Sequence, residues 1–195
     1  MSFADTVAGT ELQSEVCIRQ RIIDAALILA IREQAIPTPE NLSVRTGISE
    51  EQITDIYPGL DELAADIRVV ATERYKVLED AMPEDADLDT MLVTLVDLRS
   101  SYYEAVGELR QLGDAGEGFL PSLVKAKAVR EGKYRGRLME CFSTHFGTRT
   151  QFVVPKIELL TSWETWRHLR SVQCLTKDQS SALVCTLLRD VTAAV

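Results

Sequence analysis

The sequence predicts an all-α protein built from two helical domains. Apolar residues recur at steps of three and four along most of the chain, which is the period of one face of an α-helix. Only 10 glycines and 6 prolines interrupt the 195 residues, so the helices are expected to be long. Because 46% of the residues are hydrophobic, the chain can form a small core joined to a larger one.

The first helix is expected over residues 11–34. Its apolar residues fall on one stripe, and the helix ends before Pro37 because proline disfavours a helical conformation in the residue ahead of it. The stripe consists of Val16, Ile22, Ile23, Ala26, Leu27, Ala30 and Ile31.

A short second helix begins at a threonine-proline-glutamate sequence. Thr38 can cap the helix, Pro39 suits its first position, and Glu40 favours the positive end of its dipole. Gly47 is placed to adopt the left-handed backbone that ends such a helix.

The third helix follows this turn directly. Ser49 can cap it, and the spacing from Ser49 to Gln52 matches a capping box. The residues expected on its buried side are Ile48, Ile53, Ile56 and Tyr57.

A fourth helix is expected to start after Pro58-Gly59 and to run to about Met82, ahead of an acidic break at 83–87. We place the domain junction in this helix. Asp85, Asp87 and Asp89 are similar to a calcium loop, but the glycine and the distal glutamate of such a loop are missing, so we expect them to start the next helix. The remaining expected elements are helices at 88–112 and 121–146, a glycine-rich loop at 113–118, a polar connection at 147–151, and helices at 155–172 and 177–191. Thr176 and Gln179 repeat the capping-box spacing at the start of the last helix.

These elements match a helix-turn-helix, in which two short helices are joined by a tight glycine turn and packed on a supporting helix. This arrangement holds one helix rigidly enough to enter the major groove of DNA. Over 19–63 the chain resembles the DNA-binding domain of the TetR (tetracycline-repressor) family of bacterial transcription regulators. The residues that carry the resemblance are RQRIIDAAL (19–27), TPENLSVRTGIS (38–49) and IYPGLDEL (56–63). LLTSWETWRHLR and LTKDQSSALVCTLLRDV are similar to the last two helices of many members.

The resemblance implies a helix-turn-helix domain at 11–60, with the motif itself at 39–57, and a helical domain at 61–195 that binds a small-molecule effector and dimerises. It also implies a cytoplasmic homodimer that binds operator DNA, needs no cofactor and is not an enzyme. The residues expected at the DNA are Arg19, Thr38, Arg45, Ser49, Glu51, Gln52, Thr54 and Tyr57.

The charge of the third helix departs from the family pattern. Thr54 and Leu60 stand where members usually carry an aromatic residue and a lysine that touch phosphates. Between residues 15 and 60 there are four arginines and seven acids, a sum of 4 − 7 = −3. The acids at the helix start can serve its dipole, and glutamate can accept a hydrogen bond from cytosine. Phosphate neutralisation nevertheless needs cations.

The alternative function is that of a TetR-like protein that has lost operator binding and acts through a protein or small-molecule partner.

Aromatic residues in the second domain are the candidates for an effector pocket, because such pockets are mostly apolar with a few polar groups. Aromatic residues at helical spacing also commonly form a core or an interface, and this alternative stays open. The candidates are Tyr102, Tyr103, Met139, Phe142, Trp163 and Trp166. An apolar stripe on the last helix is expected to be buried in the dimer: Leu183, Val184, Leu187, Leu188 and Val191.

Charge and reactive residues exclude several other functions. The formal net charge of −9 provides no general attraction to nucleic acid, so DNA binding must rest on a local patch. A basic run at 125–137 reads as a solvated surface or as an anion or partner site. Two histidines without metal-ligand spacing predict no metal site. We expect four free, buried thiols at Cys17, Cys141, Cys174 and Cys185, no signal peptide, and no segment that spans a membrane.

Overall fold

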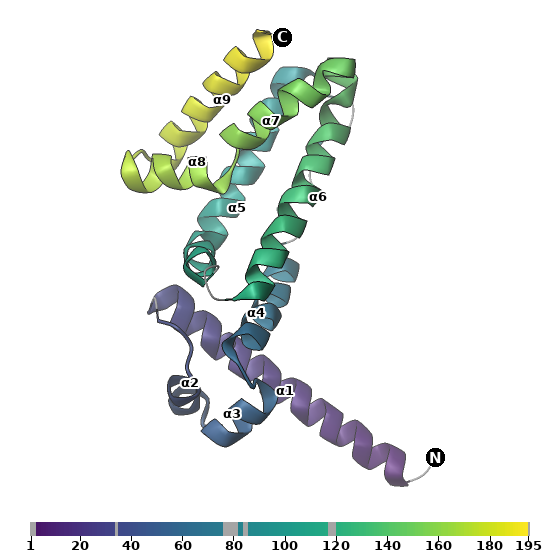
Figure 1. The fold of residues 1–195 in the computed structure, drawn as a ribbon, viewed down its shortest axis with the longest axis vertical. Coiled ribbons are helices and arrows are strands. Elements are labelled where there is room, and N and C mark those ends of the chain that lie inside the picture. Colours follow the sequence, from purple (N-terminus) through teal and green to yellow (C-terminus); the bar gives the residue numbers. More distant parts are fainter. Residues whose placement is uncertain (1–2, 34, 76–81, 84–85, 117–119, 195) are drawn as a thin grey trace. The chain divides into compact units, whose positions relative to one another are not determined.

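The computed structural model describes residues 3–33, 35–75, 82–83, 86–116 and 120–194, and within these ranges it contains helices and no β-strand (Figure 1). The predicted all-α class is confirmed. The helices are α1 (Phe3–Arg32), α2 (Pro39–Thr46), α3 (Glu50–Ile56), α4 (Leu60–Tyr75), α5 (Leu88–Gly116), α6 (Pro121–Phe146), α7 (Thr150–Leu160), α8 (Trp163–Arg167) and α9 (Lys177–Ala193), with the short segments η2 (Gly147–Arg149) and η3 (His168–Val172).

The chain divides into two compact units. The first contains Met1–Thr72 and Glu108–Lys125, and the second contains Glu73–Gly107 and Ala126–Val195. Helices α5 and α6 therefore contribute residues to both units. Among the described helices, none has the length and the apolar composition needed to cross a membrane.

The caps of α2 and α3 are where the sequence predicts them. The hydroxyl of Thr38 accepts a hydrogen bond from the backbone N–H of Asn41, and the Asn41 side chain accepts one from the N–H of Thr38. Gly47 has φ of 70°, the left-handed conformation that ends α2. Ser49 accepts from the N–H of Gln52, although the reciprocal half of that predicted capping box does not form in the described structure.

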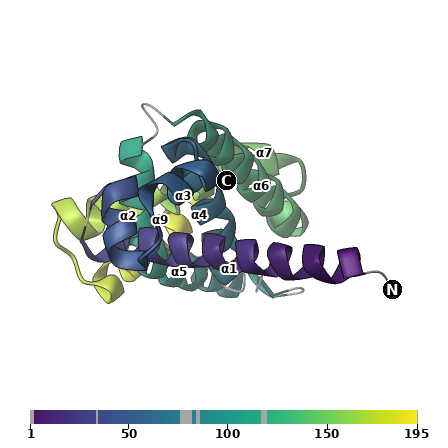
Figure 2. The same cartoon turned by 90° about the horizontal axis from the view of Figure 1, so that it is seen from below.

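The core of the first unit lies between α1 and the three short helices that follow it. The predicted side chains Ile48, Ile53 and Tyr57 are buried there with residues from α1 and α4. Helix α1 starts at Phe3, earlier than expected, because no proline or cap interrupts the chain ahead of residue 11. Figures 1 and 2 show its N-terminal half continuing beyond α2 and α3.

The core of the second unit is contributed by five segments. They bury aliphatic and aromatic side chains against one another: Met91, Leu92, Leu95 and Val96 from α5, Leu138, Phe142 and Phe146 from α6, Val153, Val154 and Ile157 from α7, Leu169 from η3, and Val184 and Leu188 from α9. The capping box of Thr176 and Gln179 that starts α9 is present as predicted.

Two predicted boundaries in this part of the chain were wrong. Helix α5 continues through Gly113 to Gly116, so the expected glycine-rich loop begins later than predicted. Residues 117–119 of that loop lie outside the described structure. Residues 76–81, at the expected end of α4, also lie outside it. The helix expected at 155–172 begins at Thr150 and contains Pro155. Because the proline removes only the hydrogen bond to the carbonyl of the exposed Gln151, solvent can satisfy that group.

The same predicted helix is broken at its centre. The backbone N–H of Thr161 closes α7 on the carbonyl of Ile157, and Ser162 caps α8 by accepting from the N–H of Thr165. This break starts the chain in a new direction (Figure 1).

Candidate nucleic-acid interface and effector site

Two arginines fix α2 on α1. Arg21 donates through Nη2 to the backbone carbonyl of Thr46 at the end of α2, with an N···O distance of 2.6 Å. Arg45 on α2 forms an ion pair with Glu33, directly after α1. Both guanidinium groups therefore hold the motif together.

Arg19, Tyr57 and Asp66 join α1, the end of α3 and α4. The guanidinium of Arg19 lies 5.3 Å from the centre of the Tyr57 ring and 3.6 Å from the Asp66 carboxylate, and it also pairs with Glu15. The Tyr57 hydroxyl donates to Asp66 at 2.9 Å. Burial and this hydrogen bond raise the pKa of Tyr57 to about 12. The phenol therefore stays protonated and acts as a donor inside the unit.

The structure separates the predicted DNA-contacting residues into two groups. Tyr57 is buried, with only 5% of its surface exposed, while the Arg19 side chain is 40% exposed and pairs with Glu15 and Asp66 within the unit. On α3 and at its start, Ser49 and Thr54 are exposed, but their hydroxyls are bonded locally. The side chains of Glu51 and Gln52 bond to no other described residue. The exposed group comprises Thr38, Arg45, Ser49, Glu51, Gln52 and Thr54.

The exposed face of α3 is acidic. Glu50, Glu51 and Asp55 are all exposed on it. Leu60, at the position where a lysine is usual in the resembled family, is only partly exposed and packs on the core of this unit. Among the four arginines between residues 15 and 60, Arg32 alone forms no hydrogen bond or ion pair with a described residue. The motif thus presents a rigid helix but few cations.

In the second unit, Arg99 lies among three tyrosine rings. Its guanidinium carbon is 5.6 Å, 4.6 Å and 4.0 Å from the centres of the Tyr102, Tyr103 and Tyr134 rings. Its Nε donates to the backbone carbonyl of Thr161 at 3.4 Å, and one Nη donates to the Tyr103 hydroxyl.

Thr161, at the break between α7 and α8, connects these groups. Its carbonyl also accepts from the Tyr103 hydroxyl at 3.0 Å. Its own hydroxyl donates to the carbonyl of Ile157, so in the 2.7 Å contact between Thr161 Oγ1 and the Tyr134 hydroxyl the tyrosine must be the donor. Burial raises the pKa of Tyr134, which keeps that proton on the phenol.

The predicted pocket residues fall into two separate clusters. Tyr102, Tyr103, Trp163 and Trp166 lie together, with the Tyr103 ring centre 5.5 Å from that of Trp163 and 6.4 Å from that of Trp166. Met139 and Phe142 instead belong to the aliphatic core, where Phe142 stacks on Phe146. Phe142 is fully buried in that core, so the structure supports the core reading for this residue.

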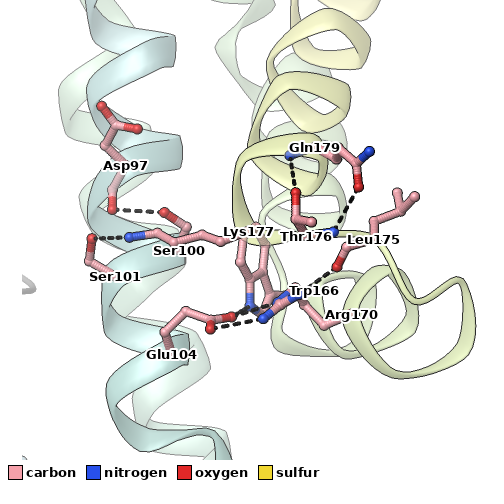
Figure 3. Close-up of polar contacts among 10 residues, drawn as sticks. All are labelled: Asp97, Ser100, Ser101, Glu104, Trp166, Arg170, Leu175, Thr176, Lys177 and Gln179. Carbon is pink, nitrogen blue, oxygen red and sulfur yellow. Dashed lines mark hydrogen bonds and ion pairs between the residues drawn. The ribbon is translucent and has the colours of Figure 1, made fainter.

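Glu104 on α5 connects this aromatic cluster to Arg170 in η3 (Figure 3). It accepts from the indole N–H of Trp166 at 3.0 Å and pairs with both ends of the Arg170 guanidinium. Arg170 also donates to the carbonyl of Leu175, and Lys177 donates to Ser101. The hydrogen bond from Arg170 is the main cause that lowers the pKa of Glu104.

The apolar stripe on α9 is divided between core and surface. Val184 and Leu188 are buried in the core, while Leu183 and Leu187 are 36% and 37% exposed. The neighbouring helix α7 also exposes Phe152 and Leu159.

Other candidate sites take structural roles. Arg135 and Lys127 from the basic run pair with Glu158 and Glu164, which ties α6 to α7 and α8. Asp87 starts α5 by accepting from Thr90. In the described part of the chain, no group of three His, Cys, Asp or Glu side chains could hold a metal ion. All four cysteines are free, but Cys17 and Cys174 are exposed, which corrects the expectation of four buried thiols.

Sequence reasoning missed Arg99, Tyr134 and Thr161. The spacing of Arg99 to Tyr102 and Tyr103 is a helical three-and-four pattern and was a usable signal. No local pattern connects Tyr134 or Thr161 to them, since these residues come from other helices.

Three solved structures share this fold. A transcriptional regulator from Rhodococcus sp. Rha1 superposes with a TM-score of 0.71 at 10% identity, over 90% of this chain and 96% of the other. A proposed transcriptional regulator from Pseudomonas aeruginosa PAO1 gives 0.64 at 16% identity, over 90% of each chain. The multidrug-binding protein EbrR, solved with imidazole, gives 0.58 at 17% identity, over 87% of this chain and 93% of that one. No protein-family model and no curated protein sequence matches the chain.

The hydrogen bond from Tyr134 to Thr161 can be tested by a double-mutant cycle. Thr161→Val keeps the shape of the side chain but leaves the phenol without an acceptor, so we expect a loss of about 2 kcal/mol in the free energy of unfolding. Tyr134→Phe should cost about 1 kcal/mol. In urea unfolding followed by circular dichroism, the double variant should lose clearly less than the sum. Additive losses would show that the two groups do not interact.

Proposed function

We propose that the chain is a TetR-like transcriptional regulator that binds DNA through the motif at 39–57, with a helix-turn-helix domain at 11–60 and an effector-binding, dimerising domain at 61–195. The observation that carries the proposal is α3 itself: a capped, exposed helix held behind a left-handed glycine turn. The fold shared with three solved structures, two of them described as transcriptional regulators and one as a multidrug-binding protein, supports it.

The bases would be read by the exposed polar side chains of α3. Gln52 can form a bidentate hydrogen bond with adenine, and Glu51 can accept from cytosine. Arg19 and Tyr57 would position the helix from within the unit, while Thr38, Arg45, Ser49 and Thr54 would lie at its edge. Effector binding, dimerisation and a cytoplasmic location belong to the same proposal. In this proposal the protein acts by binding DNA and an effector, and it catalyses no reaction.

A second candidate function is favoured by one observation, the acidic surface of α3. Because Arg19, Arg21 and Arg45 bond within the unit, few cations remain for phosphates. A TetR-like protein that has lost operator binding and acts through a protein or small-molecule partner would show this charge pattern.

The deciding experiment is an unbiased selection of bound duplexes from random DNA at low salt. Enrichment of a palindromic sequence would support the regulator, since a two-fold dimer reads two related half-sites. If no sequence is enriched and no duplex is retarded, the second candidate is favoured. For the isolated protein at physiological salt, we expect any operator binding to be much weaker than the ~10⁻⁸ M typical of specific complexes.

Added cations at the start of α3 and of α4 should raise the affinity for DNA. In Glu50→Lys with Leu60→Lys, one anion is removed and two cations are added, so non-specific affinity should rise about tenfold at low salt. The matched control is Glu50→Gln with Leu60→Gln, which changes the same positions without adding cations and should raise affinity far less. Fluorescence anisotropy with a labelled random duplex measures both. Equal affinities for the two double variants would contradict a shortage of cations.

The proposed dimer uses the exposed apolar residues of α9 and α7. Light scattering should give about twice the protomer mass of 21.7 kDa. Leu187→Glu places a charge within this face and should produce monomers at micromolar concentration. Thr186→Glu adds the same charge about a quarter-turn away on α9 and should leave the dimer intact. A monomeric unmodified protein, with Leu187→Glu making no difference, would count against this interface.

A further inference from the structure

Arg99 carries a positive charge inside the second unit without an acidic partner. No carboxylate among the described residues forms an ion pair with it, and its two hydrogen bonds go to the carbonyl of Thr161 and the hydroxyl of Tyr103. A guanidinium has five N–H donors, so these two bonds leave three donors without a described partner.

Two carboxylates that interact with the neighbouring aromatic residues are bonded to other arginines. Glu158 bonds to Arg135 through both carboxylate oxygens, at 2.7 Å and 3.2 Å. Glu104 accepts from Trp166 and Arg170. Among the described residues, the charge of Arg99 is therefore met by the faces of three tyrosine rings and by neutral oxygens. A partly buried cation in such surroundings attracts an anion far more strongly than a solvated one does.

Two further features specify the kind of anion. Tyr102 lies beside Arg99, and its hydroxyl forms no hydrogen bond with a described residue, so it provides a neutral donor next to the guanidinium. The planar fork of a guanidinium matches the two oxygens of a carboxylate. Next to these groups, Tyr103, Trp163 and Trp166 form a buried aromatic cluster, on whose edge an apolar body would pack.

We propose that the effector is a small organic carboxylate with an apolar body, whose carboxylate is bound by Arg99 and Tyr102. This inference rests on the proposed effector-binding function and names its ligand class. Because Arg99 also holds the carbonyl of Thr161, the bound carboxylate acts directly on the break between α7 and α8.

The test compares carboxylates with amides of the same shape. Benzoate, phenylacetate and octanoate are each paired with the corresponding amide, at equal ionic strength, and binding to the full chain is measured by thermal shift and calorimetry. At least one carboxylate should raise the melting temperature while its amide does not. In Arg99→Gln its affinity should fall about tenfold or more. Tyr102→Phe, which keeps the ring, should weaken binding several-fold.

The controls separate a lost site from a lost fold. Arg137→Gln removes an exposed arginine of α6 and should leave carboxylate binding unchanged. If Arg99→Gln does not fold, Tyr102→Phe carries the test. Equal shifts by acid and amide in every pair, or a carboxylate preference that survives both Arg99→Gln and Tyr102→Phe, would overturn the proposal. DNA selection succeeding while every carboxylate fails would refute this inference alone, whereas carboxylate binding without any DNA binding would refute the regulator and retain the site.

Discussion

The contact of Arg19 with Tyr57 and Asp66 is the interaction on which the helix-turn-helix depends. It joins the supporting helix, the end of α3 and the second turn of α4 through one cation, one ring and one carboxylate. The phenol proton is retained because its pKa is raised to about 12, so the donor is present at any physiological pH. This arrangement holds α3 in a fixed orientation. It also engages, within the unit, an arginine whose side chain remains 40% exposed and a tyrosine that is buried.

The packing of the helix-turn-helix and the charge of its surface therefore follow different constraints. The packing needs buried apolar residues, two caps and a left-handed glycine, and all of these are present. The surface needs cations, and in the first unit three of the four arginines before residue 60 bond within the unit. A helix can thus have the geometry of a DNA-reading element while its phosphate contacts are few. The fold is shared with three solved structures at only 10–17% identity, because a fold is set by the pattern of burial and not by the identity of surface residues.

Much of the fold could be predicted because its signals are local. Thr38, Gly47, Ser49 and Thr176 act within four residues of their partners, and each cap formed where expected. The break at Thr161 was missed because Pro155 suggested a helix start, while the groups that stabilise the break come from α5 and α6. Of the residues predicted to line a pocket, Tyr102, Tyr103 and the two tryptophans pack together, whereas Phe142 lies in the aliphatic core, and the pocket itself stays a prediction. Helical periodicity shows that a side chain is buried, but it does not show which cluster buries it.

In the second unit, Arg99 has different surroundings from the arginines of the first unit. Among the described residues, Arg99 is surrounded by three tyrosine rings and neutral oxygens, whereas Arg19 and Arg45 form ion pairs within the motif. We propose that α3 is a DNA-reading helix with few phosphate contacts. The most direct measurement is the dependence of DNA affinity on salt for the unmodified protein. The account predicts a slope of log K against log salt no steeper than about −4, which corresponds to about four phosphates neutralised. Nanomolar binding with a slope of about −6 or steeper would contradict it.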